Sequence, residues 1–85
     1  MQLTIRNKTY RLLRNIGYCK NCKSVNESTH DWLIIECSCN TCIVSGGITY
    51  KARVYGANAI NISEWLDIET GKTIDYNEIC KLNSY

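Results

Sequence analysis

The sequence predicts a small, mainly β domain: an antiparallel sheet with one short helix near its C-terminal end. Apolar and polar residues alternate over several short segments, which is the period of half-buried strands. Turn-forming residues such as glycine and asparagine separate these segments. An Asp followed three residues later by a Glu marks a helix start after the last of them. Because 85 residues suffice for one domain, we expect residues 1–85 to form a single unit.

The first half of the chain contains several predicted strands. Residues 3–5 and 10–12 alternate between apolar and polar side chains, and residues 7–8 can turn the chain between them. Residues 32–35 form a short apolar run of strand length, and residues 43–44 begin another. We therefore expect short strands connected by polar loops.

The second half contains the clearest strand pattern. Paired glycines at 46–47 interrupt the chain, and a regular alternation over residues 48–55 follows them. Apolar residues at 65–68 and 73–74 flank the segment Glu-Thr-Gly-Lys, which predicts a hairpin.

The C-terminal segment has the signals of a short helix. Asp75 can cap its first turn, and Glu78 can complete a capping box. Tyr76, Ile79 and Cys80 would then share the inner face of the helix. We therefore expect Cys80 to be a small buried side chain rather than a metal ligand.

Six cysteines need an explanation in a chain this small. A domain of this size buries only about 60% of the surface of its unfolded chain, so its core is weak without a disulfide or a bound metal ion. Residues 1–15 carry polar and charged side chains throughout, so we expect no secretion signal. No apolar run approaches the roughly 20 residues of a membrane helix. We therefore expect a cytoplasmic protein without membrane association, whose cysteines hold metal rather than form disulfides.

Five of the cysteines form two closely spaced groups. Cys19 and Cys22 make a C-x2-C turn, and Cys37, Cys39 and Cys42 follow in a second loop. Zinc binds four thiolates in a tetrahedron, so two cysteines from each group predict a structural Zn²⁺ site. The spacing leaves the second pair open, because Cys39 with Cys42 makes a C-x2-C turn and Cys37 with Cys39 a tighter C-x-C turn.

Further short motifs accompany the cysteines in a fixed order. They are C-x-x-C, Glu-Ser, His-Asp-aromatic, C-x-C, a Gly-Gly pair, and a tyrosine followed by a basic residue. Over residues 17–56 this series resembles that of small uncharacterised proteins frequent in Firmicutes and their phages. In this sequence the motifs are residues 19–22, 27–28, 30–32, 37–39, 45–47, Tyr50 and Arg53.

The resemblance implies which cysteines complete the site. It implies that Cys37 and Cys39, rather than Cys42, join Cys19 and Cys22 as zinc ligands. We expect a zinc-ribbon-like fold whose metal-binding portion covers about residues 17–56. The hairpin and helix of residues 57–85 are particular to this chain.

The sequence departs from the family pattern at three positions. Lys23 and Asn40 stand where the relatives have glycine, and Ser45 replaces an aspartate. Any role of that carboxylate is therefore lost here. The resemblance implies no reaction.

We expect a non-catalytic binding protein. Four thiolates would fill the coordination shell of the zinc and leave no position for an activated water, so we expect no enzyme. The phage resemblance suggests a protein that binds and modulates a host protein, for example in counter-defence. Expected partner-binding residues are Trp65 and Tyr76 in the tail, with Tyr50 and Arg53. At least one of Trp32 and Trp65 should belong to the core.

Charge distribution supports an alternative function. The net charge is only +2, but the basic residues dominate the N-terminal half and the acidic ones gather later. A basic face would bind nucleic acid or sequester a signalling nucleotide, unless the acids fold back and pair with it. His30, the single histidine, is expected to be a surface or structural residue, and exposed strand edges leave a homo-oligomer open. The basic residues before the first acid are Arg6, Lys8, Arg11, Arg14, Lys20 and Lys23.

Overall fold

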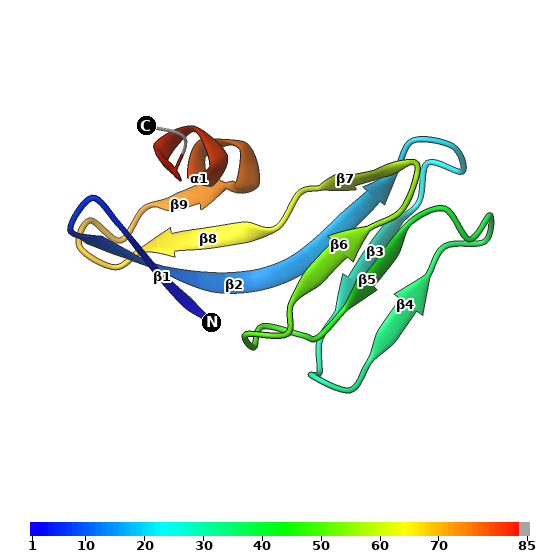
Figure 1. The fold of residues 1–85 in the computed structure, drawn as a ribbon, viewed down its shortest axis with the longest axis horizontal. Helices are drawn as coiled ribbons and strands as arrows, with labels where there is room; N and C mark the ends of the chain where they lie inside the picture. The colour runs from blue at the N-terminus through cyan, green and yellow to red at the C-terminus, as the bar shows by residue number, and fades with distance from the viewer. Residues whose placement is uncertain (84–85) are drawn as a thin grey trace.

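The computed structural model describes residues 1–83, which form nine strands and one helix (Figure 1). All paired strands are antiparallel. The prediction of a small, mainly β fold with antiparallel sheets and one short C-terminal helix is therefore confirmed. The elements are β1 (Gln2–Ile5), β2 (Lys8–Cys19), β3 (Val25–Ser28), β4 (Ile34–Glu36), β5 (Ile43–Ser45), β6 (Arg53–Tyr55), β7 (Ala59–Asn61), β8 (Glu64–Asp67), β9 (Thr73–Asp75) and α1 (Tyr76–Asn83).

Strand β2 organises most of the structure. Its first part pairs with β1 and β8, and its last part pairs with β3 and β7. A register shift between Leu12 and Arg14 separates the two parts. Figure 1 shows β2 running across the molecule from the end near α1 to the end near β3. The strands β4, β5 and β6 form a separate three-stranded sheet.

Two apolar cores lie at the two ends of β2. The first contains five buried side chains from β1, β2, β8 and α1, and the second contains three cysteines and Val44 of β5. Trp65 is only 4% exposed, which confirms that at least one tryptophan belongs to the core. The first core comprises Ile5, Tyr10, Leu12, Trp65 and Ile79, and the second Cys19, Cys37, Cys42 and Val44.

Gly17 lies at a close contact between β2 and the three-stranded sheet. A Cβ atom at this position would lie 2.7 Å from Val44 Cγ2 and 2.9 Å from Val54 Cγ1. Real Cβ atoms essentially never approach other heavy atoms this closely. The absence of a side chain at Gly17 therefore sets how tightly β2 packs on β5 and β6.

Ser28 connects three segments at the end of β3. Its hydroxyl lies 2.7 Å from the carbonyl oxygen of Leu33 and 3.2 Å from that of His30, and it can donate a hydrogen bond to either. It also accepts a hydrogen bond of 3.0 Å from the backbone N–H of Gly47. Since Ser28 is only 1% exposed, the Glu-Ser, His-Asp and Gly-Gly motifs meet around one buried hydroxyl.

The predicted strand over residues 48–55 is largely wrong. Only β6 is extended, and the preceding residues form turns in which Ala52 N–H donates to Thr49 and Thr49 N–H to Gly46. Gly46 and Gly47 have φ of 86° and 57°, and the Thr49 hydroxyl donates to the Gly46 carbonyl at 2.8 Å. These local hydrogen bonds hold the alternating segment in compact turns.

The predicted C-terminal hairpin and helix are confirmed. Strands β8 and β9 pair, and Asp75 Oδ1 accepts a 2.9 Å hydrogen bond from Glu78 N–H at the start of α1. The expectation that Cys80 is buried is wrong, because this side chain is exposed on α1 while Ile79 enters the core. Within residues 1–83 no helix combines the length and the apolar character that a membrane crossing requires.

Acidic residues fold back on part of the basic N-terminal half. Arg14 donates to both oxygens of Glu27, at 2.8 and 3.1 Å, and to Glu64 at 3.0 Å. Lys8 donates to Asp67 at 3.1 Å. The guanidinium of Arg14 lowers the pKa of the Glu27 carboxyl. Two of the cations expected to bind phosphate are therefore paired within the chain.

Candidate metal centre

Each cysteine group is held in a tight turn by backbone hydrogen bonds. After β2, Lys23 N–H donates to the Cys19 carbonyl at 2.8 Å, and Cys22 N–H points to Cys19 Sγ at 3.5 Å. After β4, Asn40 N–H donates to the Cys37 carbonyl at 3.0 Å. In addition, Cys19 N–H donates to the Ser24 carbonyl at 3.0 Å and Cys37 N–H to the Cys42 carbonyl at 3.1 Å, so a corresponding backbone hydrogen bond closes each turn.

The residue that follows each turn has a left-handed backbone. Lys23 has φ of 60° and Asn40 has φ of 59°. Glycine adopts this conformation without steric cost, and asparagine tolerates it better than lysine does. Lys23 and Asn40, where the resemblance implies glycine in the relatives, are therefore positions at which a glycine would be unstrained.

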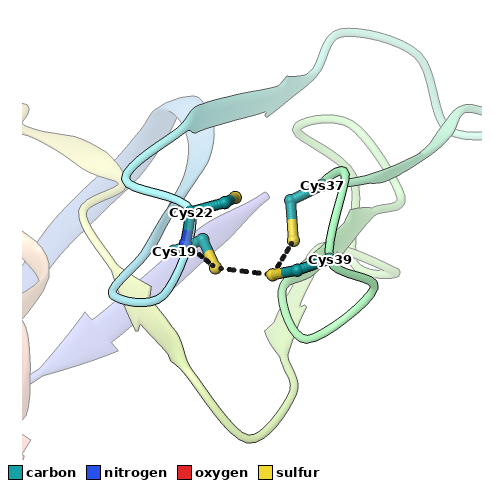
Figure 2. Close-up of side chains that lie close together, drawn as sticks. All are labelled: Cys19, Cys22, Cys37 and Cys39. Carbon is teal, nitrogen blue, oxygen red and sulfur yellow. Dashed lines mark hydrogen bonds between the residues drawn. The ribbon is translucent and has the colours of Figure 1, made fainter.

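Four sulfur atoms meet between the two turns. The Sγ atoms of Cys19, Cys22, Cys37 and Cys39 all lie within 4.8 Å of one another, and Figure 2 shows them facing one another across the gap between the turns. Cys39 Sγ is 3.4 Å from Cys19 Sγ and 3.3 Å from Cys37 Sγ. Four thiolates at about 2.3 Å from one ion lie about 3.8 Å apart in a tetrahedron. This group could hold a metal ion with small side-chain adjustments.

The other cysteines and the histidine lie outside this group. All six cysteines are free thiols. Cys42 is fully buried, with its Sγ 3.9 Å from Asn26 Nδ2, and packs in the second core. His30 is exposed and stacks on Trp32, with ring centroids 5.1 Å apart. The structure therefore brings together the cysteine set implied by the resemblance.

Hydroxyl groups beside the sulfurs favour the thiolate form. The Thr41 hydroxyl, 2.9 Å from Cys39 Sγ, is the main cause that lowers the pKa of the Cys39 thiol to about 5. The Ser24 hydroxyl, 3.0 Å from Cys22 Sγ, lowers the pKa of that thiol to about 7. Burial raises the pKa of Cys37. Two of the four thiols are thus prepared to lose their protons, which metal binding requires.

Asn58 supports both cysteine turns and was missed by the sequence analysis. Its Nδ2 donates to the Thr41 hydroxyl at 3.1 Å, and its backbone N–H donates to the Thr41 carbonyl at 3.1 Å. Its own carbonyl accepts from Lys20 N–H at 2.9 Å. The loop between β6 and β7 therefore orients the hydroxyl that contacts Cys39, and no sequence motif indicates this contact.

Replacing Thr41 by valine is expected to weaken metal binding about 10- to 100-fold while the fold is kept. The valine has nearly the shape of threonine but cannot donate to Cys39 Sγ, and loss of such outer contacts has costs of this size. The measurement is a competition titration of the purified protein against a chelator of known affinity. Thr41→Ser retains the hydroxyl and is expected to stay close to wild type. Equal affinities for the valine and serine variants would contradict this role of the hydroxyl.

The four predicted partner-binding residues are in different environments. Trp65 is buried in the first core, because β8 places the indole against β2, and its role in partner binding stays a prediction. Tyr76 is half-buried, whereas Arg53 is exposed and Tyr50 is 82% exposed. Arg53, Trp65 and Tyr76 line one pocket, and Arg53 and Tyr50 line another that also includes Trp32.

Comparison with known proteins gives one match. No curated protein and no solved structure has significant similarity to the chain. A family model, that of DUF7695, a domain of unknown function, matches residues 11–55. The matched segment runs from within β2 to the end of β6 and contains both cysteine turns. Kinship with phage proteins stays a prediction. Because the match covers more than half of the 85 residues, the chain belongs to the DUF7695 family.

Proposed function

We propose that this protein is a non-catalytic, zinc-stabilised module that binds a partner protein. Cys19, Cys22, Cys37 and Cys39 would hold Zn²⁺, since four thiolates in closely spaced pairs are the donor set that structural zinc prefers. Such a shell has no open position for a substrate or an activated water. For a phage-encoded chain the partner would be a host protein, and counter-defence is the role that we propose in that setting.

The observation that carries the proposal is an exposed aromatic surface beside the three-stranded sheet. Trp32 is 72% exposed and Tyr50 is 82% exposed, and both line a pocket of about 530 Å³. Ile34 and Arg53 line the same pocket, and Ile34 is also largely exposed. Tryptophan, tyrosine and arginine are the side chains that most often dominate the energy of protein–protein interfaces. We call this set, with Asp31 and Lys51, the Trp32 surface.

Charge favours a protein over a nucleic acid as the occupant. The Trp32 surface contains two cations, Lys51 and Arg53, and one acid, Asp31. Lys51 Nζ lies over the ring of Tyr50, 5.8 Å from its centre. Nucleic-acid affinity grows with the number of neutralised phosphates, and two cations support only weak binding. Exposed aromatic side chains beside charges of both signs fit a protein partner better.

The decisive experiment compares two truncations of exposed apolar side chains. The partner is first identified by affinity capture from a nuclease-treated lysate, and its Kd is then measured with purified components. Trp32→Ala is expected to weaken binding at least about 30-fold, the size of a hot-spot loss. Val25→Ala is the matched control, because Val25 is 63% exposed and lines neither pocket, and it should change Kd by less than about threefold.

Salt dependence separates the two candidate functions. A protein interface centred on Trp32 should lose little affinity when the salt concentration is raised, whereas phosphate contacts weaken steeply. The nucleic-acid alternative would be the better account under one outcome. In that outcome the protein captures nucleic acid, loses it when Arg6, Lys8 and Arg11 are changed to glutamate, and retains it in Trp32→Ala. The metal content of each variant verifies that it is folded.

A further inference from the structure

A second pocket lies between β2, β6 and β8, and Arg53 is the one residue that it shares with the Trp32 surface. Its volume is about 540 Å³, within the range of about 300–1,000 Å³ typical of small-molecule sites. Leu12, Val54 and the indole of Trp65 form apolar walls, and Tyr76 at the start of α1 adds a second aromatic ring. The pocket is therefore mainly apolar, with several polar groups at its edge.

One buried donor in this pocket has no acceptor. Trp65 is 4% exposed and lines the pocket, and its Nε1–H is the one fully buried side-chain polar atom among the described residues that has no hydrogen-bond partner. Buried donors are almost always paired, because an unpaired donor loses its hydrogen bond to water without replacement. An acceptor supplied from outside the chain would satisfy this indole.

Two amide side chains add a donor and an acceptor. Asn15 donates to the Ser45 carbonyl at 2.6 Å through Nδ2, and its Oδ1 accepts no hydrogen bond from the described residues. Asn61 accepts from Ser63 N–H at 2.9 Å through Oδ1, and its Nδ2 has no partner among the same residues. Together with the indole, the pocket offers two donors and one acceptor beside aromatic rings.

Arg53 supplies one positive charge at the pocket. It is the one basic side chain among the lining residues that the structure describes. Within residues 1–83 its guanidinium makes no hydrogen bond or ion pair, unlike that of Arg14. An exposed guanidinium without a partner pairs well with a phosphate, which it can contact through two N–H groups.

We propose that this pocket binds a nucleoside monophosphate. The base lies against the aromatic walls, and its ring nitrogens and exocyclic groups pair with Trp65, Asn15 and Asn61. The single phosphate pairs with Arg53. Because Arg53 is the one basic side chain that lines the pocket, the pocket suits one phosphate better than a chain of them. This site shares Arg53 with the Trp32 surface, but its other lining residues are different, and the proposal does not depend on the proposed protein binding.

Tryptophan fluorescence of the metal-loaded protein tests the site. Trp32→Phe removes the exposed indole and leaves Trp65 as the single tryptophan reporter. Titration with AMP, GMP, CMP and UMP should give a saturable change for at least one of them. The nucleoside of the nucleotide that binds best should bind at least about tenfold more weakly than that nucleotide. Inorganic phosphate alone should give no saturable change.

Two substitutions place the binding in the pocket. Trp65→Phe keeps an aromatic ring but removes the N–H. Its affinity for the nucleotide that binds best, measured by calorimetry, should be at least about tenfold lower than that of the parent protein. Asn61→Ala, at a half-buried position, should do the same without disturbing the core. No saturable signal at millimolar nucleotide, equal binding of nucleotide and nucleoside, or unchanged affinity in both variants would each overturn the proposal.

Discussion

Replacing Cys37 by serine is expected to abolish metal binding and to unfold the protein, whereas Cys42→Ser should keep both metal and fold. Structural zinc contributes about 10–16 kcal/mol in small domains, which exceeds the stability of most proteins of this size. Cys37 Sγ lies within the four-sulfur group, and Cys42 Sγ does not. The serine hydroxyl at position 42 would face Asn26 Nδ2, so its burial should cost only about 1–2 kcal/mol.

Metal content and thermal unfolding of both variants measure this difference. Zinc per chain, determined by elemental analysis, should be about one for the wild type and Cys42→Ser and near zero for Cys37→Ser. Chelation of the wild type should reproduce the unfolded circular dichroism spectrum of Cys37→Ser. If Cys42→Ser lost zinc and Cys37→Ser kept it, the C-x2-C pairing of Cys39 with Cys42 would be the correct one.

Gly17→Ala is expected to destabilise the metal-loaded protein by about 2–3 kcal/mol. The added methyl group would overlap Val44 Cγ2 and Val54 Cγ1, and forced overpacking of a core has costs of this order. Because Val44 is fully buried, it cannot swing into solvent to relieve the overlap. Urea unfolding with fixed excess metal gives the free energy of unfolding of each variant.

A second glycine and a double-mutant cycle provide the controls. Gly71 has φ of 75°, but a Cβ there would meet no atom within 4 Å, so Gly71→Ala isolates the backbone cost of about 1 kcal/mol. Val44→Ala should cost less in the presence of Gly17→Ala than alone, because it makes room for the new methyl group. The coupling should be about 1 kcal/mol or more. A purely additive pair would show that the two positions do not press on each other.

Local signals account for the parts of the fold that the sequence predicted well. The hairpin of β8 and β9 and the start of α1 depend on neighbouring residues, namely the turn at 69–72 and the Asp75 cap. The alternation over 48–55 was misleading, since the hydrogen bonds of Thr49 hold that segment in turns. The full length of β2 could not be predicted from residues 10–12, because its partners β7 and β8 lie about 40 residues or more away.

The sequence predicted the kind of metal site, but not the contacts that hold its residues in place. Two closely spaced cysteine pairs indicate a metal site from sequence alone, yet spacing does not choose between Cys37 and Cys42. The contact of Asn58 with Thr41 joins residues 17 positions apart and has no motif. Trp32 and Trp65 have the same side chain, but the packing of β8 on β2 buries Trp65, whereas Trp32 lies before β4 and is exposed.

The two-sided pairing of β2 has a consequence for the order of folding. Its last part pairs with β3 through a short loop, with Asn15 opposite Ser28, whereas Arg14 and Glu64 are 50 positions apart along the chain. Closing the longer loop costs more chain entropy, and during synthesis residue 64 emerges long after β2 and β3. We expect the cysteine end to close first and to leave the edge of β2 that faces β8 unpaired, since β1 pairs with the other edge. Pulsed hydrogen exchange should therefore show early protection at β3 and late protection at β8. The C-terminal segment would then complete the domain by pairing with β2 after the other end of β2 is already fixed.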